Sequence, residues 1–86
     1  IDRSRGLGDV YKRQIQCMWM KNTSIPLSIA FIKEEGVISD IYNLYPFSTL
    51  SVCSTDKVKY ALEVNRGWFK ENEITRGDTV ISSQIK

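Results

Sequence analysis

The side chains best suited to chemistry gather in two short segments, residues 19–23 (WMKNT) and residues 62–68 (LEVNRGW). An indole beside an ammonium group and several amides suits a polar ligand, because the indole supplies apolar contact area and a few donors fix the orientation. The pattern therefore predicts a ligand-binding site. Its candidate residues are Trp19, Lys21, Asn22, Thr23, Glu63 and Asn65.

The same residues also have a purely structural interpretation. Asn22 and Thr23 can satisfy a turn, Asn65 can cap a helix, and Lys21 can pair with Glu63. Three functions follow from these alternatives. The leading hypothesis is a non-enzymatic domain that binds a polar ligand or partner. The second is a hydrolase or transferase with Glu63 as acid or base and Lys21 stabilising negative charge. The third is a structural accessory domain.

Most familiar catalytic and cofactor motifs are missing from the sequence. It contains no His, which removes the commonest general base and a principal zinc ligand. A phosphate-binding glycine loop is also lacking, because RGLGD at residues 5–9 has no following Lys-Ser or Lys-Thr. We therefore assign no catalytic residue and expect no metal or cofactor. The RGD triplet at residues 76–78 is interpreted as a turn.

The two cysteines, Cys17 and Cys53, have two interpretations. They could form a disulfide in an oxidising compartment, or serve as two small apolar residues. Cys17 falls in a predicted strand, whereas Cys53 falls in a distant predicted loop that is rich in Ser and Thr. We therefore predict that they are not bonded.

The formal charge of +2 is unevenly distributed. Residues 1–14 hold four basic and two acidic residues, and residues 15–86 hold eight of each. A nucleic-acid surface needs clustered Lys and Arg to displace the counterions of phosphates. We therefore expect no nucleic-acid partner.

Residues 1–14 do not read as part of a fold. They have no period of 2 or of 3.6, and Gly6 and Gly8 would interrupt any element. Residues 9–14 (DVYKRQ) resemble a transposase adaptor from sequencing libraries, translated in frame. We predict that residues 1–14 are non-native or disordered. Residues 15–86 would then be one domain of a metagenomic fragment, incomplete at its N-terminus.

Alternating apolar residues predict short strands through most of residues 15–86. Residues 57–65 alternate well, with Val58, Tyr60, Leu62 and Val64 on one face of a half-buried strand. The apolar runs are all shorter than the ~20 residues that a membrane-spanning helix needs. The predicted fold is mainly β, a small sandwich or partly open barrel. The predicted elements are a strand at 15–20, a hairpin at 27–44 turning at Gly36, a loop at 46–56, a strand at 57–65, a short helix near 66–73 capped by Asn65, and a last strand at 79–85.

Residues 18–80 contain a series of motifs in a characteristic order. They are WMKNT, IPL, a hairpin containing a Gly, a Ser/Thr/Cys-rich loop, ALEVNxG, and GD before the last strand. In these the chain resembles the bacterial and archaeal family called domain of unknown function 192. The resemblance implies a compact, mainly β domain, commonly exported or anchored outside the membrane. It therefore predicts an extracytoplasmic location, periplasmic or membrane-anchored. It implies no established activity.

The chain departs from the usual pattern of that family at two positions. Ser28 stands where the family usually has Asp, and Arg66 stands where it usually has Ala. A ligand site that used the Asp would be altered here. The family also carries an Arg-Gly-Leu-Met segment and an apolar strand well before WMKNT, and Arg5 lies too close to Trp19 to leave room for them.

Overall fold

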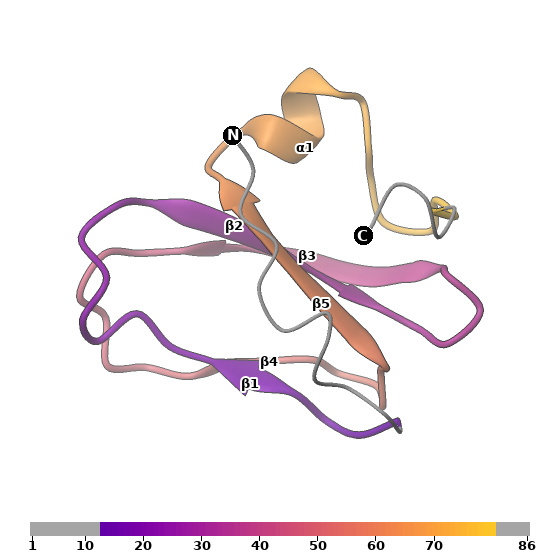
Figure 1. Cartoon of the computed structure of the whole chain (residues 1–86), viewed down its shortest axis with the longest axis horizontal. Helices are drawn as coiled ribbons and strands as arrows, with labels where there is room; N and C mark the ends of the chain where they lie inside the picture. Colours follow the sequence, from indigo (N-terminus) through magenta and orange to yellow (C-terminus); the bar gives the residue numbers. More distant parts are fainter. Residues whose placement is uncertain (1–12, 81–86) are drawn as a thin grey trace.

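The computed structural model describes residues 13–80. These residues form two antiparallel sheets and one short helix, with no closed barrel (Figure 1). The predicted mainly β fold is confirmed. In chain order the elements are β1 (Cys17–Met18), β2 (Leu27–Ile32), β3 (Ile38–Leu44), β4 (Val52–Cys53), β5 (Tyr60–Asn65) and α1 (Trp68–Glu71).

The larger sheet has the order β3-β2-β5, with β2 in the centre. β2 and β3 form the predicted hairpin, in which Leu27 pairs with Leu44. The turn closes through a bond from the Lys33 amide to the Val37 carbonyl, 2.8 Å long, and Gly36 adopts a φ of 93°. A residue with a Cβ rarely adopts that backbone conformation, so Gly suits the turn. All six residues of β2 are buried.

The two faces of this sheet bury separate apolar clusters. Figure 1 shows the β1–β4 ribbon on one side of the sheet and α1 on the other. Alternate residues of β2 supply both clusters, as the period of a strand requires. On the ribbon side the buried cluster is Met20, Leu27, Ile29, Phe31, Leu44, Val58 and Ala61; on the helix side it is Ala30, Ile32, Ile38, Leu62, Val64 and Phe69.

Strand β5 differs from its prediction in burial and in register. Regular pairing begins at Tyr60, and Ala61 to Val64 are buried on both faces, so the strand is not half-buried. Val58 belongs to the cluster opposite that of Leu62. The reason is that Val58 lies in an isolated bridge to Gln14, and the irregular backbone at Lys59 interrupts the alternation.

Helix α1 lies within the predicted range of 66–73 but begins without the predicted cap. Gly67 occupies the N-cap position with a φ of 89°, and no side chain caps the helix. Asn65 remains in β5, so the prediction that it caps the helix is wrong. Phe69 is the buried residue of the helix, which is therefore held by packing rather than by capping.

The predicted loop at 46–56 contains strand β4, and this changes the outcome for the cysteines. β4 pairs with β1 so that Cys17 lies directly opposite Cys53. The two Cα atoms are 4.0 Å apart and the residues form a disulfide. The prediction that they are not bonded is wrong, because pairing of two very short strands brings residues 36 positions apart face to face.

The ends of the described region are tied by backbone bonds. Gln14 and Val58 exchange two bonds, of 3.0 and 2.9 Å, and Thr79 bridges to Val37. The interpretation of residues 1–14 and the predicted strand at 79–85 fall mostly outside the described residues. Within residues 13–80, no helix is long and apolar enough to cross a membrane.

Candidate functional site

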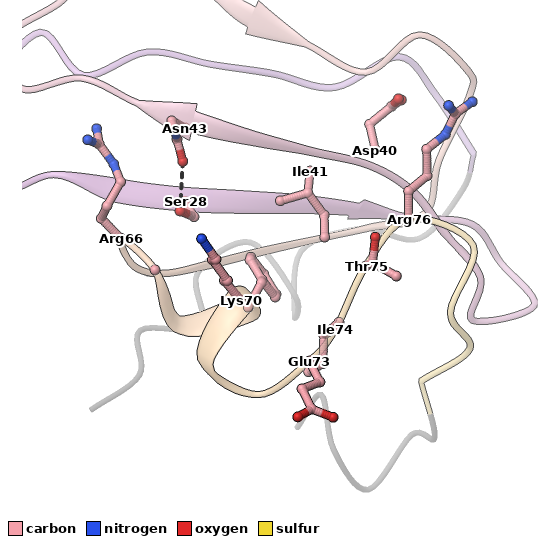
Figure 2. Close-up of a pocket in the computed structure, with 12 residues that line it drawn as sticks. Ser28, Asp40, Ile41, Asn43, Arg66, Lys70, Glu73, Ile74, Thr75 and Arg76 are labelled. Carbon is pink, nitrogen blue, oxygen red and sulfur yellow. Dashed lines mark hydrogen bonds between the residues drawn. The ribbon is translucent and has the colours of Figure 1, made fainter.

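An open hollow of about 860 Å³ lies on the helix side of the larger sheet. Strands β2 and β3 form its floor, and α1 with the loop that follows it forms its wall (Figure 2). It exists because a helix of four residues covers only part of the sheet. Its lining residues are Ser28, Asp40, Ile41, Asn43, Arg66, Gly67, Phe69, Lys70, Glu73, Ile74, Thr75 and Arg76.

The floor of the hollow carries a pair of hydrogen-bonded polar side chains. Ser28 and Asn43 are direct partners between β2 and β3, so their side chains share a face. The Ser28 hydroxyl donates to Asn43 Oδ1 over 3.2 Å. Beside them, Ile41, Phe69 and Ile74 supply apolar wall. The hollow thus combines apolar surface with a few fixed polar groups, as small-molecule sites do.

Three cationic side chains line the hollow, and two of them are held by backbone carbonyls. Arg66 Nη2 donates to the Leu44 carbonyl over 2.8 Å, and Arg76 Nε donates to the Ser39 carbonyl over 2.9 Å. Both Arg side chains are therefore fixed. Lys70 makes no ion pair or hydrogen bond through its side chain within residues 13–80. Figure 2 shows its ammonium group directed toward Ser28.

The two acidic side chains at the hollow do not neutralise Lys70. Asp40 Oδ2 accepts a bond of 2.7 Å from the Thr55 hydroxyl and one of 3.5 Å from the Thr55 amide. Glu73 has a backbone φ of 58°, and Figure 2 shows its carboxylate directed away from the strands. The charge presented to the interior of the hollow is therefore positive.

This arrangement favours binding over catalysis. A serine nucleophile needs a neighbouring base to take its proton. The Ser28 hydroxyl instead donates to an amide oxygen, which is not a base at neutral pH. Within residues 13–80, no three His, Cys, Asp or Glu side chains are grouped so that they could hold a metal ion. The chemistry that the lining supports is recognition of a negative charge next to an apolar group.

The predicted site residues at 19–23 lie elsewhere, in the connection between β1 and β2. The Lys21 ammonium is 5.4 Å from the centre of the Trp19 ring. The Thr23 amide donates to the Met20 carbonyl over 3.0 Å, which closes a turn with Lys21 and Asn22 exposed at its tip. The turn interpretation of these residues is thus confirmed.

The other two predicted residues belong to β5. Glu63 pairs with Ile29 and is buried, whereas Asn65 pairs with Leu27 and is exposed. None of the six predicted residues lines the hollow. Within residues 13–80, Lys21 and Asn22 make no side-chain hydrogen bond to Asn65. A ligand at these six residues stays a prediction.

Reasoning from the sequence missed Lys70, Arg76 and the Ser28–Asn43 pair. One signal was present: Ser28 is the single polar residue of β2, although Asn43 shares β3 with Ser39 and Asp40. A bulge between Phe31 and Ile32 shifts the register, however, so counting back from the turn would have placed Ser28 opposite Tyr42. Lys70 carries no such signal, because a lysine in a short helix is ordinarily a solvated residue.

Comparison with known proteins gives a family and a fold. A family model, DUF192, described as "Uncharacterized ACR", matches residues 1–82. No curated protein is similar enough to match. A crystal structure from Sinorhizobium meliloti 1021, described as a "putative transcription regulator", is 36% identical with a TM-score of 0.77.

That match covers 86% of this chain and 56% of the Sinorhizobium chain, so this sequence spans little more than half of that protein. The residues that the family model matches make up nearly the whole of the present sequence. They include both the larger sheet and the residues that line the hollow. The chain therefore belongs to the family called domain of unknown function 192.

Proposed function

We propose that this domain is a binding module for a small organic anion, held in the hollow between α1 and the β2–β3 hairpin. The observation that carries the proposal is the Lys70 ammonium, which has no partner within residues 13–80 and is directed toward the Ser28–Asn43 pair. A charge-assisted hydrogen bond from Lys70 would hold a carboxylate, and the floor would orient it.

The apolar wall narrows the class of ligand. Ile41, Phe69 and Ile74 line the hollow beside the cation, so a carboxylate that carries an alkyl chain suits it better than a bare inorganic ion. The resemblance to the family pattern adds support. Ser28 in place of Asp and Arg66 in place of Ala both make the lining more positive. Both changes favour an anion.

The description of the Sinorhizobium protein as a putative transcription regulator raises binding of nucleic acid as a second candidate function. Direct binding of nucleic acid would need a basic face, whereas residues 15–86 hold equal numbers of basic and acidic residues. A concave hollow suits a small molecule instead. We therefore favour the small anion as the ligand of this domain.

An extracytoplasmic location is part of the proposal. The Cys17–Cys53 disulfide supports it, because such bonds persist in oxidising compartments and are rare in the cytosol. For protein expressed in the periplasm, we expect to recover the disulfide-bonded form. For protein retained in the cytosol, we expect to recover the reduced form.

The binding proposal is tested with hexanoate as probe and its neutral counterpart, hexanamide. Hexanoate titrated into the labelled protein is expected to shift the amide resonances of Ser28, Asn43 and Phe69. Lys70→Gln is expected to weaken hexanoate by about tenfold or more, since bonds to charged groups contribute about 1.5–3 kcal/mol. Lys57→Gln, which removes an exposed lysine outside the hollow, is the matched control and is expected to leave affinity unchanged.

Two outcomes contradict the proposal. Equal binding of hexanoate and hexanamide would show that the charge is not recognised. Shifts centred on Lys21 and Glu63 would place the ligand at the residues singled out from the sequence instead of in the hollow.

A further inference from the structure

Two loops at one end of the molecule lie side by side. Residues 19–26 connect β1 to β2, and residues 45–51 connect β3 to β4 (Figure 1). Backbone bonds join them: the Phe47 amide donates to the Thr23 carbonyl over 3.0 Å, and the Met20 amide donates to the Ser48 carbonyl over 3.3 Å. The two loops therefore form one continuous surface, called here the paired loops.

The paired loops carry nearly all the exposed large apolar side chains of the described region. Six such side chains are exposed within residues 13–80, and five of them lie here; the sixth is Ile15. Monomeric domains rarely leave so many together in water without a binding role. The five are Trp19 (54% exposed), Ile25 (44%), Tyr45 (59%), Phe47 (61%) and Leu50 (76%).

The outward placement of these side chains is built into the backbone. Phe47 has a φ of 61°, a conformation that a residue with a Cβ adopts only when its surroundings impose it. The core beneath the loops is already filled, since Met20, Leu27 and Leu44 are buried there. The Cys17–Cys53 disulfide ties the base of the two loops. The exposed surface is thus held in place rather than left unfolded.

The charges around the paired loops are of one sign. Residues 19–26 and 45–51 contain Lys21 and no Asp or Glu. The Lys21 ammonium lies 5.4 Å from the Trp19 ring centre, and the Arg66 guanidinium lies 4.6 Å from that of Tyr45. Each cation therefore accompanies an exposed aromatic ring. This surface is complementary to one that is apolar inside and negative at its boundary.

We propose that the paired loops dock onto the surface of an anionic lipid bilayer. Trp19 and Tyr45 have the amphipathic rings that settle at the level of lipid headgroups, while Phe47 and Leu50 enter the acyl boundary. Lys21 and Arg66 face the headgroup phosphates. Single-stranded nucleic acid suits the surface less well, because it requires a cationic track along its backbone and does not use aliphatic side chains.

The test uses sedimentation of the whole chain with vesicles of two compositions. One contains phosphatidylglycerol and phosphatidylcholine in equal parts, and the other contains phosphatidylcholine alone. The wild type is expected to bind the anionic vesicles more strongly. The double variant Phe47→Ser/Leu50→Ser is expected to lose about tenfold or more in partitioning, because two apolar side chains no longer leave water.

Three further variants separate the surface from the rest of the molecule. Ile15→Ser removes an exposed apolar side chain outside the paired loops and is expected to leave partitioning unchanged. Lys21→Gln is expected to lower binding about fivefold on anionic vesicles and not at all on neutral ones. Lys70→Gln, which tests the hollow, is expected to have no effect on vesicles. Thermal melts confirm that each variant is folded.

The proposal is overturned if the wild type sediments with neither vesicle. It is also overturned if the double variant binds anionic vesicles as the wild type does. A dimer in sedimentation velocity that the double variant abolishes, without vesicle binding, would assign the surface to a second copy of the chain. Binding of oligothymidine that the double variant abolishes, again without vesicle binding, would assign the paired loops to nucleic acid.

Discussion

The two sides of the central sheet are covered by different means. On the helix side, Phe69 and its neighbours pack onto the sheet as ordinary core, and a short helix leaves part of the face open as the hollow. On the ribbon side, two strands of only two residues each cover the sheet and are joined by the Cys17–Cys53 disulfide. Strand pairs this short have too few hydrogen bonds to be stable alone. A covalent bond supplies the missing restraint.

The difference extends to the surfaces that each side offers. The helix side presents a concave, positively charged hollow with fixed polar groups at its floor. The ribbon side ends in the paired loops, which expose five large apolar side chains. Arg66 contributes to both surfaces, but the variants that test the two proposals change separate residues, Lys70 in the first case and Phe47 with Leu50 in the second. A variant of one leaves the other testable.

The largest effect on stability is expected from removing a buried ring from either of the two apolar clusters. Phe31→Ala removes a fully buried ring on the ribbon side, in contact with the Tyr42 ring at 6.2 Å between centres. We expect a loss of about 3–5 kcal/mol in the free energy of unfolding. Phe69→Ala on the helix side is expected to cost less, because a four-residue helix can settle into the space. Urea titration of both variants measures the difference. Equal costs would show that the two sides are equally rigid.

The next effect tests the covalent restraint on the ribbon. Cys17→Ser/Cys53→Ser is expected to lower the free energy of unfolding by about 2–4 kcal/mol, since the bond closes a loop of 36 residues in the unfolded chain. Hydrogen exchange should quicken at Met18 and Val52 more than at Ile29. Exchange that quickens equally at Ile29 would mean that ribbon and sheet open together, and the contrast between the two sides would fail.

Much of the larger sheet was predictable from the sequence, because its strands obey local rules. The hairpin at 27–44 has Pro26 at its entry, alternating apolar residues and a glycine where the turn needs positive φ. The helix near 66–73 and the mainly β class also follow from local patterns. The order of the strands, with β5 beside β2, needs the whole chain, since the two are far apart in sequence.

The ribbon and the hollow could not be predicted in the same way. β4 is two residues long and sits among Ser and Thr, so no period marks it, and the disulfide depends on its pairing. The hollow is formed by Ser28, Lys70 and Arg76, which meet only after the helix folds over the hairpin. The contact between the Lys21 ammonium and the Trp19 ring, at 5.4 Å from the ring centre, needs no such long-range pairing, because the two residues are neighbours in the chain.

The smallest expected effect concerns the polar tie between the two sides. The Thr55 hydroxyl, just after β4, donates to the Asp40 carboxylate of β3 over 2.7 Å. Thr55→Val keeps the shape of the side chain and removes the donor. We therefore expect a loss of about 1 kcal/mol in the free energy of unfolding. This is a small loss for a hydrogen bond to a charged group, because Thr55 is exposed. Thr55→Ser keeps the donor and should recover most of that loss in urea titration.

The control is Thr49→Val, which changes an exposed threonine without a side-chain hydrogen bond within residues 13–80. It should change the free energy of unfolding little. Equal effects of Thr55→Val and Thr49→Val would mean that the bond from Thr55 to Asp40 does not help to fasten the ribbon to the sheet.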